Sequence, residues 1–179
     1  IENIDVGGPT MVRSAAKNYK DVTVITSSKQ YGELIEELSK NKGSTSLGFR
    51  EKLSRIAFTE TAYYDSVISD YFNKKTNIIF PKKRVFHANL VDTPRYGENP
   101  HQKSAIYSKN SSMKINQIQG KQLSYNNYND IFSALTISKS LPKNTGTVIV
   151  KHANPCGVSI NKDHLKSYKS ALELSLIHI

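Results

Sequence analysis

Apolar positions in the first half of the chain recur mainly at helical spacing. The clearest stripe runs from about Ser46 to Asn73, where apolar side chains follow at steps of three, four and seven. Pro9 suits the first position of an earlier helix, because a helix does not need its missing N–H there. Short β-branched runs interrupt the helices. The elements predicted for this half are strands over 4–6 and 21–26 and helices over 10–18, 29–40 and 46–73.

The helical pattern breaks between Lys74 and Pro94 into short apolar pieces separated by prolines and basic residues, which indicates a domain junction. Beyond it, Thr147–Val150 is a continuous apolar run, as expected of a strand covered on both faces. Strands alternating with helices predict an α/β fold in two partial domains, 1–80 and 81–179. The elements predicted for the second half are strands over 103–107, 115–118 and 147–150 and helices over 129–141 and 163–174.

Composition and charge narrow the class of protein. The 37% hydrophobic content is ordinary for a globular chain, and the sequence contains neither an apolar run long enough for a membrane span nor a signal segment. A single cysteine, Cys156, fits a reducing compartment, so we expect a cytoplasmic protein with no membrane partner. The net charge of +10 is compatible with RNA or with anionic small molecules. The lysines are scattered, however, and a basic RNA-binding module is kept as the alternative function.

Candidate chemistry lies in VIVKHANPCGV, where an apolar run ends on Lys151 and His152. Adjacent strand residues point to opposite faces, so a bend is needed to bring both side chains into one pocket, and Asn154–Gly157 is predicted to be that turn. A metal site fails because the chain has no second cysteine. A Cys156 nucleophile, proton transfer by the Lys-His pair, and a surface lysine beside a turn histidine all stay open.

A second polar cluster, RYGENPHQ, begins at Arg95. Arg95 offers a guanidinium fork for phosphate and Tyr96 a ring for stacking, while Asn99 and His101 add hydrogen-bonding groups. A well-packed polar turn is the structural alternative.

These motifs carry a family resemblance. RYGENPHQ followed by VKHANPCG closely resembles bifunctional purine-synthesis enzymes that combine phosphoribosylaminoimidazolecarboxamide formyltransferase with IMP cyclohydrolase. The opening IDVGGPTMVRSAAKN is similar to the cyclohydrolase domain of that family, and AFTETAYYDSVISDYF to the helix that leads out of it. The four motifs occur in the family's order, and the likeness extends to about Leu172.

The resemblance implies two reactions, two folds and a set of substrates. A formyl group passes from 10-formyltetrahydrofolate to the 5-amino group of the imidazole carboxamide ribotide, and the product then closes its second ring to give IMP. Residues 1–80 would belong to a methylglyoxal synthase-like cyclohydrolase domain. Residues 81–179 would belong to a cytidine deaminase-like formyltransferase domain without zinc. The resemblance also implies a cytosolic homodimer that needs no metal and binds no nucleic acid.

The resemblance also implies roles for residues of the formyltransferase half. His152 would accept the proton of the attacking amine. Lys151 would stabilise charge on the formyl oxygen or protonate the departing folate nitrogen. Arg95 would hold the ribotide phosphate, Tyr96 would stack on the base, and Asn127 would contact the substrate.

In the cyclohydrolase half the resemblance implies that Asp5 and Lys17 take part in ring closure. A helix between them would separate them by well over about 10 Å at about 1.5 Å per residue. They are therefore expected to contact different parts of one nucleotide. A helix-dipole partner for Asp5 and a surface position for Lys17 are the alternatives.

Both ends of the chain look like cuts through a longer protein. The family begins well before Ile1 and continues well beyond the end. The tail LSLIHI matches no segment of the family, so residues 175–179 are suspected to be an artefact. The fragment by itself is expected to have neither activity.

Overall fold

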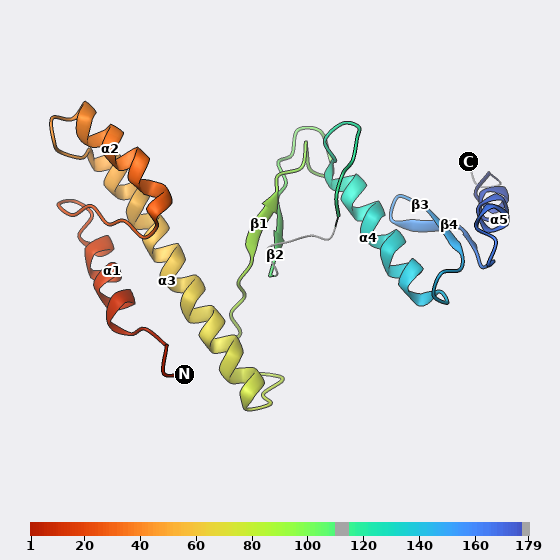
Figure 1. Ribbon diagram of the computed structural model, residues 1–179, viewed down its shortest axis with the longest axis horizontal. Coiled ribbons are helices and arrows are strands. Elements are labelled where there is room, and N and C mark those ends of the chain that lie inside the picture. Colours follow the sequence, from red (N-terminus) through yellow and green to blue (C-terminus); the bar gives the residue numbers. More distant parts are fainter. Residues whose placement is uncertain (110–114, 177–179) are drawn as a thin grey trace. The chain divides into compact units, whose positions relative to one another are not determined.

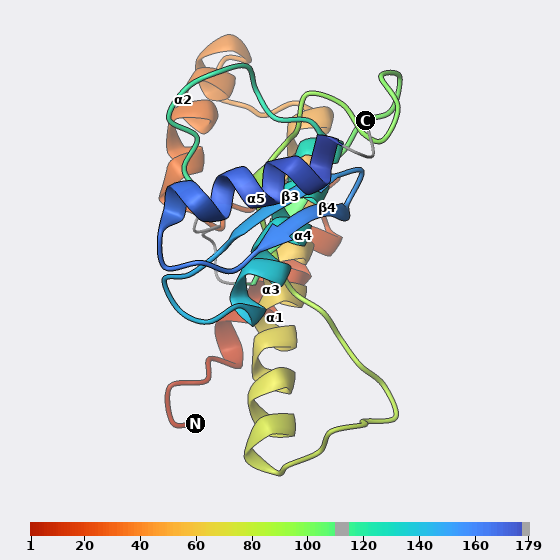
Figure 2. The ribbon, with the colours of Figure 1, turned by 90° about the vertical axis from the view of Figure 1, so that its right-hand side faces the viewer.

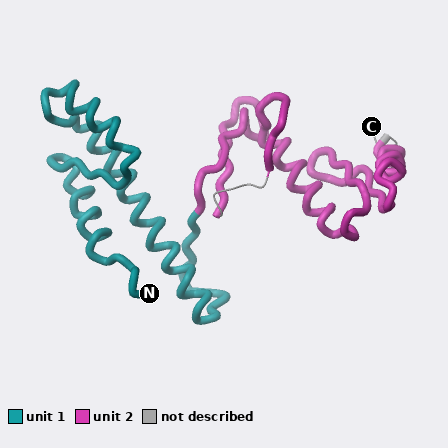
Figure 3. The backbone as a smooth tube through the Cα atoms, viewed as in Figure 1, with its two compact units in different colours: residues 1–87 teal, residues 88–179 magenta. Residues whose placement is uncertain are grey.

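The computed structural model describes residues 1–109 and 115–176, and the chain divides into two compact units, residues 1–87 and residues 88–179 (Figure 3). The predicted boundary at residue 80 lies in the irregular stretch between the last helix of the first unit and the first strand of the second. Helices and strands are mixed, which confirms the predicted fold class at that level. None of the described helices is both long and apolar enough to cross a membrane.

Unit 1 is built from helices (Figure 1). The three helical segments predicted from apolar spacing are all present, and the longest begins and ends within two residues of its predicted bounds. Ser46 caps this helix by accepting a hydrogen bond from the Phe49 N–H. The elements are α1 (Gly7–Lys17), the 3-10 turn η1 (Ser28–Gln30), α2 (Tyr31–Lys40) and α3 (Leu47–Lys75).

The core of unit 1 lies between α1, α3 and the segment before η1. Its buried members are Ala16, Val24, Leu53 and Ala57. Two of them are alanines, which lets α1 and α3 approach closely, and the Ser54 hydroxyl donates to the Ala16 carbonyl across this contact at 2.7 Å. The Arg50 guanidinium donates to the Tyr19 and Lys20 carbonyls just beyond α1. The contact therefore combines small apolar residues with hydrogen bonds to backbone carbonyls.

Neither strand predicted for this half is formed. Residues 22–27 have no regular secondary structure, although Val24 within them is buried. A β-strand needs a neighbouring strand to pair its N–H and C=O groups, and within the described part of unit 1 no segment pairs with residues 22–27. Residues 4–6 form the lead-in to α1 rather than a strand. The predictions of strands over 4–6 and 21–26 were wrong for this reason.

The described residues of unit 2 form two antiparallel hairpins and two helices. In the first hairpin, β1 pairs with β2 and Leu90 lies opposite Tyr107. In the second, β3 pairs with β4, and the register places Lys151 opposite Asn154. The elements are β1 (Asn89–Asp92), β2 (Ile106–Ser108), α4 (Tyr125–Ser140), β3 (Thr147–Lys151), β4 (Asn154–Ser159) and α5 (His164–Leu176).

The β3–β4 hairpin lies between α4 and α5, as Figures 1 and 2 show. α4 contacts β3, and α5 packs against both strands. The approach of α5 is so close that a Cβ on Gly157 would overlap the carbonyl oxygen of Ala171, so only glycine fits there. Asp163 begins α5 by accepting hydrogen bonds from the N–H groups of Leu165 and Lys166.

Several predictions for this half need correction. Residues 115–118 are not a strand, and the strand predicted over 103–107 is shorter and begins at Ile106. β1 was not predicted. α4 begins at Tyr125, four residues before the predicted Asn129, because Ser124 and Asn127 form a capping box there. α5 extends through Leu176, and residues 177–179 of the tail lie outside the described residues.

A partly buried hydrogen bond joins the first hairpin to α4. The Tyr128 hydroxyl donates to the Asp92 carboxylate at 2.6 Å, and Tyr128 is only 9% exposed. This bond, helped by burial, raises the pKa of Tyr128 to about 12. The hydrogen bond needs a protonated phenol, and Tyr128 therefore stays protonated at pH values well above the usual tyrosine pKa.

Tyr128 is expected to titrate above the ordinary tyrosine pKa of about 10. A folded-state pKa above the unfolded value means that its contribution to stability is fully present below about pH 10 and is lost as the pH rises through about 12. The measurement is the phenolate absorbance of residues 1–179 minus that of the Tyr128→Phe variant. The difference should show a midpoint near 12. A midpoint near the ordinary value of about 10 would show that the Asp92 bond does not hold in solution.

Candidate functional sites

His152 lies in a tight two-residue turn at the tip of the β3–β4 hairpin. The pairing of Lys151 with Asn154 leaves His152 and Ala153 as the turn residues, and their φ angles are 51° and 61°. Two successive left-handed residues define a type I′ turn, which normally favours Asn-Gly. Lys151 and His152 are both exposed at this tip. The bend predicted for the Lys-His pair therefore exists, but it lies at His152 itself.

The segment predicted to be the turn is a strand. Asn154–Ser159 forms β4, and the pairing skips Cys156, since Ile149 lies opposite Gly157 and Val150 opposite Pro155. A β-bulge at Cys156 explains how a proline is accommodated here. The half-buried Cys156 thiol points to the Ile149 carbonyl, with Sγ and O 3.5 Å apart. This contact gives the thiol a structural place in the bulge.

The RYGENPHQ segment forms a loop closed by its own backbone and by α4. The Arg95 N–H donates to the Leu123 carbonyl at 2.9 Å, and the Tyr125 N–H donates to the Tyr96 carbonyl at 3.1 Å. Inside the loop the Gly97 N–H donates to the Gln102 carbonyl at 2.8 Å. Two consecutive residues, Arg95 and Tyr96, are thus fixed at the N-terminus of α4.

The side chains of Arg95 and Tyr96 contact each other. The guanidinium carbon lies 4.9 Å from the centroid of the Tyr96 ring, and an Arg95 Nη atom lies 3.3 Å from the Tyr96 hydroxyl. Arg95 is exposed and Tyr96 is half-buried. A cation–π contact at an exposed site is worth about 0.5–1 kcal/mol, so a ligand phosphate can draw the guanidinium away at small cost.

Unit 1 has a cleft between the start of α1 and α3. Its volume is about 630 Å³, and its lining includes Asp5, Thr26, Glu60 and Tyr64. The Asp5 carboxylate accepts a hydrogen bond from the Gly8 N–H at 2.9 Å, and the Asp5 N–H donates to the Tyr64 hydroxyl at 2.8 Å. Asp5 therefore accepts a hydrogen bond from the first turn of α1 while it lines the cleft.

Most of the chain matches a known family. Residues 15–176 match the family described as the AICARFT/IMPCHase bienzyme. The chain belongs to the AICARFT/IMPCHase bienzyme family.

Curated relatives carry the name bifunctional purine biosynthesis protein PurH. The relative from Persephonella marina is 48% identical over 96% of this chain and 35% of its own length. The relative from Bradyrhizobium diazoefficiens is 46% identical over 96% of this chain and 34% of its own, and the Rhizobium rhizogenes relative is 43% identical over 96% and 33%. The chain thus spans about a third of the length of the curated relatives it matches.

Within this AICARFT/IMPCHase chain, the predicted site residues fall into separate places. Arg95, Tyr96 and Asn127 gather around the N-terminus of α4, whereas Lys151 and His152 occupy the hairpin tip. The Asn127 side-chain oxygen lies 3.0 Å from the backbone nitrogen of Ser124 and accepts its hydrogen, completing the capping box. In unit 1, Asp5 precedes α1 and the exposed Lys17 ends it, so the two lie at opposite ends of this helix as expected.

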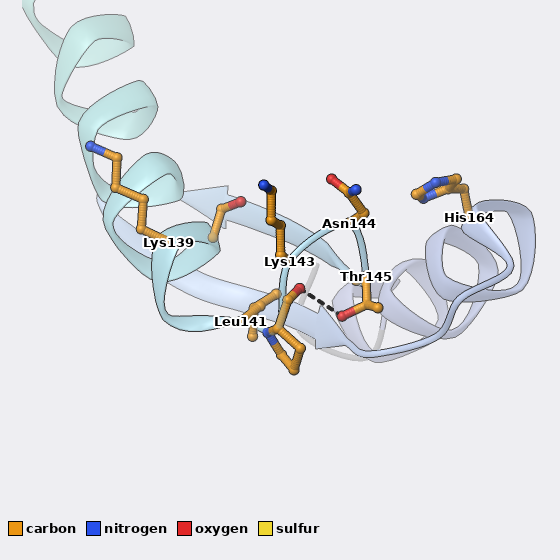
Figure 4. Close-up of a pocket in the computed structure, with 9 residues that line it drawn as sticks. Lys139, Leu141, Lys143, Asn144, Thr145 and His164 are labelled. Carbon is orange, nitrogen blue, oxygen red and sulfur yellow. Dashed lines mark hydrogen bonds between the residues drawn. The ribbon is translucent and has the colours of Figure 1, made fainter.

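The concave site shown in Figure 4 lies elsewhere in unit 2, at the C-terminal end of α4. It has a volume of about 400 Å³ and is lined by the basic side chains of Lys139, Lys143 and His164. These side chains and Asn144 project toward the same side of the loop (Figure 4). None of the predicted site residues lines this site. Among the residues that the structure describes, no group of three or more His, Cys, Asp or Glu side chains is placed to hold a metal ion.

Sequence reasoning missed one residue that touches the hairpin tip. The Asp130 carboxylate, from α4, accepts a hydrogen bond from the Ala153 N–H at 2.7 Å. Asp130 lies in the first half of a helix, and no apolar pattern marks it. The sequence therefore did not indicate its contact with a turn that follows more than twenty residues later.

Proposed function

We propose that this chain is part of an enzyme that catalyses the last two steps of IMP synthesis. In the first step, formyl transfer, the formyl group of 10-formyltetrahydrofolate would pass to the 5-amino group of the aminoimidazole carboxamide ribotide. In the second step, ring closure, the carboxamide nitrogen would attack the formyl carbon and water would leave. The family match over residues 15–176 is the observation that carries this proposal.

Unit 2 would supply part of the formyltransferase site. His152 would take the proton of the amine while the amine nitrogen bonds to the formyl carbon. Lys151 would stabilise the formyl oxygen, or would protonate the folate nitrogen as the bond between that nitrogen and the formyl carbon breaks. Arg95 would hold the phosphate, Tyr96 would stack on the base, and Asn127 would contact the ribotide.

The arrangement around α4 supports these roles. The Tyr125 N–H holds Tyr96, and the Asp130 carboxylate holds the turn that contains His152. Residues 125 and 130 both belong to α4. One helix thus holds both the loop that carries Arg95 and Tyr96 and the turn that carries His152, the proposed general base.

Unit 1 would supply part of the cyclohydrolase site. Asp5 lines the cleft and would orient the substrate or accept a proton, and Lys17 would offset the negative charge that develops during attack. We further propose a methylglyoxal synthase-like fold for this domain and a cytidine deaminase-like fold without zinc for the next. The whole enzyme would be a cytosolic homodimer that binds neither nucleic acid nor membrane. The isolated residues 1–179 would be inactive, since they cover about a third of the relatives.

The proposal is tested in a chimera, called here the test enzyme, in which residues 1–179 replace the matched third of the Persephonella marina relative. The test enzyme is expected to catalyse both folate-dependent formyl transfer and ring closure. A test enzyme that is folded by circular dichroism and catalyses ring closure, yet never transfers the formyl group, would contradict the formyltransferase assignment. Salt-sensitive RNA binding without either activity would favour the alternative, a basic RNA-binding module.

A further inference from the structure

The turn that carries His152 is strained. Left-handed backbone is uncommon for residues with a Cβ, and two in succession are normally found where glycine or asparagine is present. Here the two residues are His152 and Ala153, with φ of 51° and 61°. Such conformations persist only where the surrounding structure holds them. The hairpin must therefore contain interactions that fix this turn.

Two hydrogen bonds hold the single peptide group between His152 and Ala153. Its N–H, from Ala153, donates to the Asp130 carboxylate at 2.7 Å. Its C=O, from His152, accepts from the Asn154 side-chain amide at 2.8 Å. Because both ends of the peptide plane are held, the ψ angle of His152 and the φ angle of Ala153 are fixed together. The direction in which the His152 side chain leaves the backbone depends on these angles.

The two bonds differ in kind. Asn154 is exposed and adjacent to the turn, so its bond is local. Asp130 is half-buried and belongs to α4, which packs against β3. Its carboxylate forms a charge-assisted bond, the stronger class of hydrogen bond. Asp130 therefore fixes the turn to the same helix that holds the backbone of Tyr96.

We propose that Asp130 is a positioning residue for formyl transfer, which acts by holding the His152–Ala153 peptide so that the imidazole faces the substrate amine. This inference rests on the proposed function. Asp130 would not contact the substrate. It acts through the backbone of the turn, and an acceptor oxygen at this position is what the turn requires.

Three variants of the test enzyme separate positioning from other roles. Asp130→Ala removes the acceptor and is expected to lower kcat for formyl transfer by roughly 10- to 100-fold, since a displacement of about 1 Å can cost that much. KM for the ribotide should change by less than about 3-fold, because the phosphate loop is untouched. Asp130→Asn keeps an acceptor oxygen and should stay within about 3-fold of the parent kcat.

The decisive variant is Asp130→Ala combined with Ala153→Gly. Glycine adopts the left-handed conformation without strain, so the turn can form without Asp130. The kcat of this double variant for formyl transfer is expected to be at least about 5-fold higher than that of Asp130→Ala. Asp130→Ala should also speed hydrogen exchange at the Ala153 amide, which measures the turn directly and independently of activity.

The outcomes distinguish the two proposals. A test enzyme that lacks formyl transfer altogether contradicts the proposed function, while exchange at Ala153 still reports whether Asp130 holds the turn. If formyl transfer is present and Asp130→Ala leaves its kcat unchanged, the positioning role is wrong. Equal losses of kcat in Asp130→Asn and Asp130→Ala would also overturn the positioning role, because they would indicate that the charge of Asp130 is needed. An equal loss of ring closure would overturn it as well, because it would indicate general unfolding.

Discussion

His152→Ala is expected to lower kcat for formyl transfer in the test enzyme by about 10²- to 10⁴-fold, the usual contribution of a general base. The amine of an aminoimidazole carboxamide is a weak nucleophile because its lone pair is delocalised into the ring. It must therefore lose its proton as the bond to the formyl carbon forms. The exposed His152 imidazole, at the tip of a held turn, is the group proposed to take that proton.

Ring closure by the same variant should stay within about 2-fold of the parent, since that reaction is assigned to unit 1. The matched control is His164→Ala, another exposed histidine, at the start of α5 and outside the residues proposed for either reaction, which should leave both kcat values unchanged. Steady-state assays of both reactions on one preparation make the measurement. Formyl transfer that survives His152→Ala at more than about a tenth of the parent rate would remove His152 from the role of base.

The helices could be predicted from the sequence because their signal is local. The apolar stripe that predicts a helix over 46–73 includes Leu53 and Ala57, which α3 (Leu47–Lys75) buries in the core of unit 1, although Val67, Tyr71 and Phe72 at its other end are exposed. Residues 21–26 carry an equally clear strand pattern, but a strand also needs a partner. The presence of a partner strand depends on the fold, so the apolar run alone could not determine whether residues 21–26 form a strand.

The β3–β4 hairpin shows why residue types that favour turns predicted the bend at the wrong place. Asn154, Pro155 and Gly157 are residue types that favour turns, whereas His152 and Ala153 are not. The structure reverses this assignment because tertiary contacts override local preference. Asp130 and the Asn154 side chain hold the turn at His152–Ala153, and a bulge at Cys156 lets the proline stay in a strand.

The candidate site residues were proposed from motifs rather than from geometry. RYGENPHQ and VKHANPCG pointed to Arg95 and His152 and to a family that the match over residues 15–176 confirms. What the motifs could not supply was the support around them. The contact of Asp130 with Ala153 joins segments more than twenty residues apart, and no local pattern encodes it.

Leu53→Ala is expected to lower the free energy of unfolding of unit 1 by about 2–3 kcal/mol, the lower part of the range for buried leucines. Leu53 is fully buried between α1 and α3 and has the largest side chain in a core whose other buried members are Ala16, Val24 and Ala57. Its removal would therefore leave a cavity where the two helices meet. Half-buried neighbours such as Val12 and Phe49 can move into part of that cavity, which keeps the loss from reaching the upper limit of about 5 kcal/mol.

Leu47→Ala is the matched control, because it is the same substitution on the same helix at a residue that is 52% exposed. It should change the free energy by less than about 0.5–1 kcal/mol. Hydrogen exchange of the α3 amides in residues 1–179 gives the opening free energy of unit 1 separately from that of unit 2. If both variants lose the same amount, the α1–α3 contact is not the core of this unit in solution. A loss confined to Leu53→Ala would show that packing at one leucine holds together the two helices that line the Asp5 cleft.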